Sequence, residues 1–244
     1  MKFSKKKVFV AALAVCLIAI LSMGSLAWFN AKDEVTNTFN VADSTGPSVS
    51  PNFSIKVEET SNDSSVADKV DNNTYNDVLP GQKIAKDPTI TNTSTESSQF
   101  VRVNIVISKA FADQIAEVQN TTAANLDLTK LLVGFNTAKY EDARVFDNTT
   151  YADYYIYAYY LKGKLAVGDA NKHVVFTDVQ IPGNFVQEDM NYGEFKINVK
   201  AEAVQTKFLG NGVDTASEAF AAVGWEVGTD YDYPASEPTS SIQP

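Results

Sequence analysis

The chain has 244 residues, of which 44% are apolar and 20% are charged. This composition excludes a wholly disordered or collagen-like protein and leaves room for one large domain or two small ones. Twenty Lys and Arg residues against thirty Asp and Glu residues give a formal net charge of −10. A body this acidic repels phosphate backbones, so nucleic-acid binding is not expected.

The N-terminus has the three parts of a secretory signal. A cluster of lysines precedes the unbroken apolar run 8–21, and the small residues Ser25 and Ala27 follow at the spacing that a signal peptidase requires. As a helix, this run spans ~21 Å, which is short of the ~30 Å hydrocarbon core of a membrane. We predict export with cleavage after Ala27, so that the mature chain begins at Trp28. The alternative is that the segment is retained as a membrane anchor.

Cysteine usage excludes a disulfide framework. Cys16 is the only cysteine, and it lies inside the apolar run of the signal. The mature chain therefore has none, even though an exported protein meets an oxidising compartment that would permit disulfides. We expect a surface protein that relies on the size of its core.

Strict alternation of apolar and polar side chains is the dominant pattern of the mature chain. It runs through residues 53–58, 101–108 and 195–203. Each run predicts a strand with one face on a core and the other in water, which is typical of antiparallel sheets. Weaker strands are expected at 89–91 and within 174–181. The pattern predicts an all-β fold with short helical insertions, arranged as a jelly roll or β-sandwich.

Two short helices are expected among these strands. Phe111, Ile115 and Val118 follow one another at helical spacing and predict an amphipathic segment. Residues 215–218 form a capping box before an apolar run, and Gly224 is a typical helix stop.

The composition shifts along the chain predict its domain organisation. We expect a signal peptide at 1–27, an N-terminal arm at 28–40, a single jelly-roll domain at 41–227 and a disordered acidic tail at 228–244. Within the domain, the segment 61–76 is rich in Asp, Asn and Ser and is predicted to be a mobile loop.

Catalytic chemistry has no recognisable motif in this sequence. His173 is the only histidine, and we predict it to be a surface residue in the loop before a strand. No H-E-x-x-H helix, P-loop or dinucleotide fingerprint occurs. The acid pairs Glu58–Glu59 and Glu141–Asp142 are expected by chance in so acidic a chain. We therefore predict that the protein is not an enzyme and has no catalytic, cofactor-binding or metal-binding residues.

The run 154–160 is unusually rich in tyrosine. In a strand, Tyr155, Tyr157 and Tyr159 share one face. One interpretation is an exposed aromatic surface for glycans or a neighbouring subunit. The other is a central strand whose rings cover the core, because aromatic residues are good strand formers.

Several motifs, read in chain order, resemble the TasA/camelysin family of Gram-positive bacteria. They are residues 24–29, 35–39, 79–88, 90–93, 100–103, 159–160, Gly168, 175–182, 195–205 and 216–223. The resemblance implies a jelly-roll fold, processing by the signal peptidase SipW and secretion to the extracellular matrix or cell surface. It also implies assembly into biofilm-matrix fibres, in which the N-terminal strand of one subunit completes the sheet of the next. Some camelysins are described as casein-cleaving metalloproteases.

Three functions follow as hypotheses, and a fibre subunit is the first. Cleavage would free an apolar arm that a second copy can bury by strand addition, and head-to-tail repetition gives a filament. The assembly residues of this arm are Trp28, Phe29, Val35 and Phe39. The expected partners are the chain itself, a SipW-type signal peptidase and other matrix components. The alternative is that the arm folds back as an edge strand of its own domain. The other two functions are a surface adhesin or glycan-binding module and a camelysin-like protease.

Overall fold

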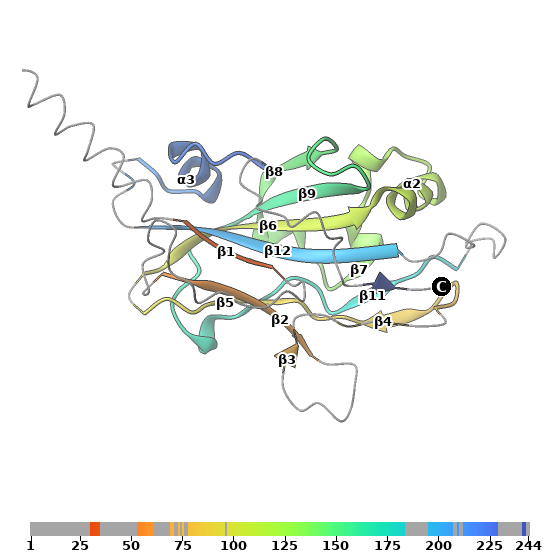
Figure 1. The fold of residues 1–244 in the computed structure, drawn as a ribbon, viewed down its shortest axis with the longest axis horizontal. Helices are drawn as coiled ribbons and strands as arrows, with labels where there is room; N and C mark the ends of the chain where they lie inside the picture. The colour runs from red at the N-terminus through yellow and green to blue at the C-terminus, as the bar shows by residue number, and fades with distance from the viewer. Residues whose placement is uncertain are drawn as a thin grey trace, which may run out of the picture.

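A computed structural model describes residues 30–34, 53–60, 69–70, 73, 75, 78–95, 97–183, 195–206, 209, 212–228 and 241–242. In this part of the chain the fold is mostly β-sheet with two short α-helices (Figure 1). The prediction of a β-fold with short helical insertions is confirmed at this level.

The largest sheet has six strands, and all of its pairings are antiparallel. Its strands in spatial order are β1 (Asn30–Glu34), β12 (Phe195–Gln205), β6 (Gln99–Ser108), β9 (Tyr154–Leu161) and β8 (Tyr140–Asp147), and β13 (Ser241–Ile242) also pairs with β12. The two longest strands, β6 and β12, lie side by side at the centre.

Two smaller sheets complete the described fold. One has the order β10 (His173–Val174), β5 (Thr89–Asn92), β2 (Ile55–Thr60) and β3 (Lys69–Val70), and the other has the order β4 (Lys83–Ala85), β11 (Asp178–Gln180) and β7 (Leu132–Val133). Strands β2, β4 and β5 lie below β6 and β12 in Figure 1. The predicted strand at 174–181 is thus two strands, β10 and β11, that belong to different sheets.

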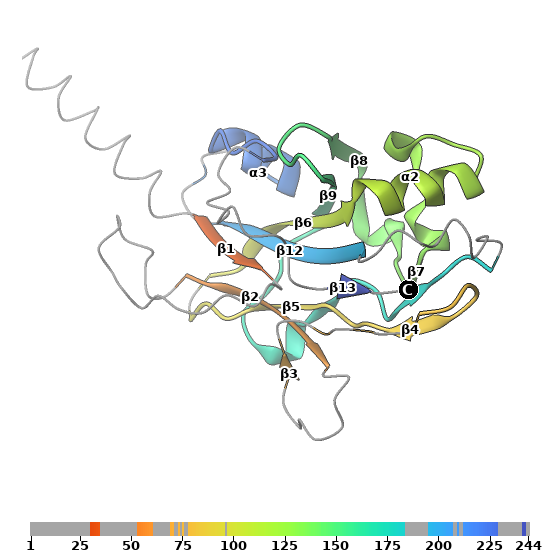
Figure 2. The same cartoon turned by 45° about the vertical axis from the view of Figure 1, so that its right-hand side comes forward.

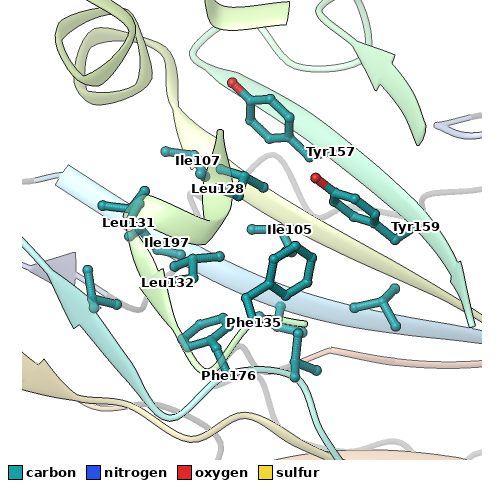
Figure 3. Close-up of a cluster of buried hydrophobic side chains, with 14 of the residues drawn as sticks. Ile105, Ile107, Leu128, Leu131, Leu132, Phe135, Tyr157, Tyr159, Phe176 and Ile197 are labelled. Carbon is teal, nitrogen blue, oxygen red and sulfur yellow. The ribbon is translucent and has the colours of Figure 1, made fainter. Parts of the chain in front are cut away.

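One hydrophobic core joins all three sheets. It fills the space between the inner faces of β6, β9 and β12 and the smaller sheets (Figure 3). Its members in Figure 3 are Ile105, Ile107, Leu128, Leu131, Leu132, Phe135, Tyr157, Tyr159, Phe176 and Ile197. This core is continuous across the described elements from β2 to β12.

Both predicted helices are present. In α2 (Lys109–Val118) the Phe111 ring stacks on Phe195 at 4.0 Å between centroids, and Ile115 is buried. α3 (Ala216–Ala222) begins at the predicted capping box. The Thr215 hydroxyl accepts a hydrogen bond from the backbone N–H of Glu218, and the Glu218 carboxylate accepts one from the backbone N–H of Thr215. Gly224 ends this helix at φ 67°, a conformation that favours glycine. Short 3-10 helices lie at Ala123–Asn125, Leu128–Lys130, Thr137–Lys139 and Asp169–Asn171.

The outer face of the large sheet is also covered, which differs from the prediction. β2 alternates between buried and exposed positions as expected, but β6 and β12 are buried on both faces. Above their outer face, α3 and Trp225 form a second apolar cluster with Phe100, Tyr160 and Val204. The polar residues of β6 and β12 in the alternating pattern are therefore buried instead of facing water.

Two predicted irregular segments contain strand structure. Residues 69–70 of the predicted mobile loop form β3, which pairs with β2. Residues 241–242 of the predicted disordered tail form β13, which pairs with Phe195 and Lys196 of β12. For these four residues the predictions were wrong, because local composition carries no information about a distant partner strand. Residues 61–68 and 229–240 lie outside the described part of the chain.

Candidate assembly edge

Strand β12 has two edges with different partners. On one side it pairs with β6 from Ile197↔Ile107 to Gln205↔Gln99. On the other side, β1 pairs with residues 200–204 and β13 pairs with residues 195–196. Figure 2 shows β1 and β13 following one another along this second edge. The outer edge of β12 is thus completed by two segments close to the ends of the chain.

The register of β1 pairs its residues with positions 200–204 of β12. Ala31 is the partner of Ala203, which belongs to the main core. Lys32 is the register partner of Glu202, and Glu34 is the register partner of Lys200. Directly opposed residues of opposite charge stabilise one register of an antiparallel pair. The two strands therefore have complementary charge sequences in the observed register.

A buried polar cluster lies on the outer face of β6 and β12, next to this edge. Arg102 is fully buried and pairs with the Glu202 carboxylate, to which Asn104 also donates a hydrogen bond of 2.9 Å. The Arg102 guanidinium donates to the carbonyl of Trp225 at 2.7 Å and lies 4.3 Å from the Phe220 ring centroid. Burial without these partners would be costly for either charge. The cluster thus fastens the α3 layer to the sheet.

Asn198 is another buried polar residue of β12. Its side chain is fully buried on β12, and neither its amide nitrogen nor its oxygen has a hydrogen-bond partner among the described residues. It lies between the stretches of the edge that β1 and β13 cover. A buried, unsatisfied amide costs about 1–3 kcal/mol, so this part of β12 has unused capacity to bind a polar group.

The predicted cleavage and assembly residues lie outside the described part of the chain. This holds for Ser25 and Ala27 at the cleavage site and for Trp28, Phe29, Val35 and Phe39 of the arm. The segment between them, β1, is paired with the chain's own β12. Within one chain, the middle of the arm therefore takes the position of an edge strand, which is the fold-back arrangement that the sequence left open.

The tyrosine run does not form an exposed aromatic surface. Tyr157 and Tyr159 are buried in the main core (Figure 3), and burial raises the pKa of both hydroxyls. Tyr155 is half-buried, and its hydroxyl donates to Asp113 at 3.1 Å. Of the two interpretations of this run, the structure agrees with the central strand for Tyr157 and Tyr159, because β9 lies between β6 and β8 and their rings cover the core.

His173 is buried, which corrects the prediction of a surface residue. Its Nε2 lies 2.8 Å from the Tyr140 hydroxyl, and burial lowers its pKa from 6.5 to about 4. It forms the first residue of β10 and pairs with Ile90 of β5. The ring therefore stays neutral at physiological pH and joins β10 to β8.

The members of the two acid pairs noted in the sequence have separate structural roles. Glu141 accepts a hydrogen bond of 2.7 Å from the backbone N–H of Ala216 at the start of α3. Glu58 pairs with Lys56 on the surface, whereas Glu59 is fully buried. The two members of the Glu58–Glu59 pair thus point to opposite faces of β2, as strand geometry requires.

Searches of the described residues for two further kinds of site find neither. No helix in this part of the chain is long and apolar enough to cross a bilayer. No group of three or more His, Cys, Asp or Glu side chains that could hold a metal ion occurs among these residues. Comparison with protein-family models, with curated proteins and with solved structures finds no match to this chain.

Proposed function

We propose that this protein is a secreted structural subunit of extracellular fibres of the biofilm-matrix type. In the fibre, the N-terminal segment of one copy pairs with β12 of the next copy in the position that β1 occupies within the single chain. The observation that carries the proposal is the outer edge of β12, which is completed by a strand that starts three residues after the predicted cleavage site. We further propose that the fold belongs to the jelly-roll class of β-sandwiches, as the family resemblance implies.

Exchange between copies is physically inexpensive at such an edge. An edge strand supplied by a chain terminus makes the same backbone hydrogen bonds whether it comes from its own domain or from another copy. The domain keeps its core in either case, because the partner of β12 on the inner side is β6. Low protein concentration then favours pairing within one chain, and high concentration favours pairing between copies. Head-to-tail exchange generates an open filament.

The register of β1 supports a longer strand in the assembled state. If an added strand continued in the same register, Val35 would lie opposite Val199 and Phe39 opposite Phe195, two members of the main core. Thr36 would lie opposite Asn198, whose buried amide needs a partner. Full burial of the four apolar arm residues would contribute ~6–12 kcal/mol. Association costs are of similar size, so assembly should be slow and sensitive to conditions.

The experiment compares three forms of the mature protein by electron microscopy and size-exclusion chromatography. Protein that starts at Trp28 should form filaments, whereas protein that starts at Asn40 should stay monomeric and folded. Trp28→Asp combined with Phe29→Asp should weaken assembly. Leu79→Asp is the matched control, because Leu79 is an exposed apolar residue on a turn far along the chain from the arm.

A peptide of residues 28–39 makes the test more specific. It should bind the protein that starts at Asn40, as measured by native mass spectrometry, because the truncation frees the β12 edge. Fibres of unchanged width from the truncated protein would show that assembly does not use this arm. A mature protein that stays monomeric at all concentrations would favour simple fold-back.

Secretion and processing are tested separately. We propose export through a SipW-type peptidase with cleavage between Ala27 and Trp28. N-terminal sequencing of the exported protein should begin at Trp28, and Ala27→Glu should leave the precursor uncut. A glycan-binding function has no comparable support, since two of its three proposed tyrosines are buried.

A further inference from the structure

Three polar side chains that are distant in the sequence meet in the interior near β2 and β4. Glu59 lies in β2, Asn73 follows β3, and Lys86 follows β4. All three are buried, with exposed fractions of 0%, 3% and 1%. Residues of these types are rarely buried so fully without a specific reason.

One carboxylate holds the other two groups. The Lys86 ammonium contacts Oε1 of Glu59, and the Asn73 amide nitrogen donates to Oε2 of the same carboxylate at 3.2 Å. The Asn73 amide nitrogen also donates to the carbonyl of Thr60 at 2.9 Å. The amine and the amide therefore lie side by side on the two oxygens of a single acid.

The surroundings keep this group in place and away from water. The Tyr75 hydroxyl donates to the carbonyl of Ala85 at 2.5 Å and is hydrogen-bonded to the Asn73 side chain, and its ring packs against the main core. Asp87 accepts hydrogen bonds of 2.6 Å from the backbone N–H and the hydroxyl of Thr60. Burial raises the pKa of Tyr75, and the neighbouring carboxylates of Glu59 and Asp87 raise it further. The phenol thus stays a neutral hydrogen-bonding group.

We propose that Lys86 and Asn73 react to form an intramolecular isopeptide bond, with Glu59 transferring the proton. In the first step, the Lys86 ammonium passes a proton to the Glu59 carboxylate, which it contacts directly. The neutral amine then attacks Cγ of Asn73 and a new C–N bond forms. Glu59 returns its proton to the amide nitrogen of Asn73, the C–N bond to this nitrogen breaks, and ammonia leaves. The Glu59 carboxylate then takes the second proton from the attacking nitrogen and passes it to the departing ammonia, which leaves the site as ammonium. No oxidant, metal or cofactor is needed.

The position of the three groups supports a reaction over a simple ion pair. An amine, an amide carbon and a proton-transferring acid held in one buried site gain the rate advantage of proximity and general acid–base catalysis. An ion pair alone needs only two of the three residues. The bond would fasten the segment after β3 to the segment after β4, and thereby two different sheets, in a mature chain that has no cysteine. This inference is independent of the proposed fibre function.

Intact-mass spectrometry of the freshly purified mature protein tests the proposal directly. The measured mass should be lower than the sequence mass by one molecule of ammonia. Peptide mapping should find residues 73 and 86 in one branched peptide. A mass equal to the sequence mass would overturn the proposal without any variant being needed.

Three variants assign the roles. Lys86→Arg and Asn73→Ala should each prevent the reaction, so that the measured mass of either variant equals the mass calculated from its sequence. Glu59→Gln should also give a measured mass equal to the sequence mass, although Lys86 and Asn73 are both still present. This variant therefore tests whether Glu59 transfers a proton or only contacts the two reacting groups. Circular dichroism checks that each variant is folded. If Glu59→Gln is folded and carries the bond at the wild-type level, Glu59 has no role in the reaction.

Lys200→Arg provides the matched control. Lys200 is also buried, lies opposite Asn104 on the neighbouring strand, and has a glutamate, Glu202, on the same face. In that cluster, however, Arg102 holds the carboxylate. Lys200→Arg should therefore retain the mass deficit. A deficit that disappears in Lys200→Arg and persists in Lys86→Arg would overturn the assignment to Lys86.

Discussion

Phe195 and Ile242 are antiparallel register partners at the outer edge of β12. If a strand continued the register of β1 along this edge, Phe39 would meet Phe195 as well. The C-terminal strand β13 therefore occupies backbone positions that a fully added N-terminal strand would need. In the proposed fibre, the two ends of the chain would therefore compete for one stretch of β12.

Deletion of residues 241–244 should therefore promote assembly. Backbone hydrogen bonds contribute about 0.5–1.5 kcal/mol net each, so each bond lost with β13 should lower the critical concentration by up to about tenfold. Light scattering against protein concentration measures this. A protein that lacks residues 28–39 as well should stay monomeric. Slower assembly after the deletion would instead mean that β13 supports the fibre.

An exchange of two charges in β1 tests its register. Lys32→Glu combined with Glu34→Lys keeps the composition and the net charge, but it places like charges opposite Glu202 and Lys200. Each mismatched pair should cost roughly 0.2–1 kcal/mol. Fibre yield should fall, and peptide 28–39 with the same exchange should bind the truncated domain more weakly. Asp33→Asn, opposite Ala201, is the control and should have little effect.

His173 should make stability depend on pH. Its pKa is about 4 in the folded protein and 6.5 when unperturbed, so the unfolded chain binds this proton more tightly. The free energy of unfolding should therefore fall as the pH decreases from 6.5 towards 4, by up to about 3 kcal/mol. Above pH 6.5, His173 should be neutral in both states and should not change the free energy of unfolding with pH. Urea unfolding at both ends of the range measures the difference.

The double variant His173→Phe with Tyr140→Phe isolates this contribution. It removes the titrating group together with its hydroxyl partner, so the part of the pH dependence due to His173 should disappear. Tyr140→Phe alone should retain it, because the imidazole stays buried. An unchanged pH dependence in the double variant would assign the effect to other groups.

Arg102 should be the most sensitive charged residue of the large sheet. Arg102→Met leaves Glu202 buried without its cation, and such a change typically costs 3–5 kcal/mol. Arg102→Met combined with Glu202→Leu should recover much of this loss, since no buried charge remains. Thermal and urea unfolding of the two variants give the comparison. Equal stabilities of the two variants would show that the pair is not strongly coupled.

The sequence was sufficient for elements whose signal is local. The alternation at Phe53, Ile55 and Val57 located β2, and the spacing of Phe111 and Ile115 located α2. The capping box located the start of α3. In each case, neighbouring residues contain both the pattern and its physical cause, so no information about the rest of the chain was needed.

Elements and sites that depend on distant partners were missed. β8 contains Glu141 and Asp142 and has no clear alternation, so its place at the sheet edge next to β9 was not predicted. Lys200 and Glu202 alternate with apolar residues in the way that usually indicates a water-facing side. Their burial depends on segments distant in the sequence, because Arg102 holds Glu202 and bonds the carbonyl of Trp225, and the Lys200 ammonium lies 5.8 Å from the centroid of the Tyr151 ring. The Glu59–Asn73–Lys86 site is likewise a product of three separate segments.

The ladder between β12 and β6 has a mechanical consequence for the proposed fibre. It consists of nine consecutive register pairs, and β1 runs alongside it on the other edge of β12. If subunits were joined through β1, tension along the filament would act nearly parallel to these strands. The hydrogen bonds of the ladder would then be loaded in shear and would have to break together. Such a joint should yield at much higher force than one whose strands are peeled apart pair by pair.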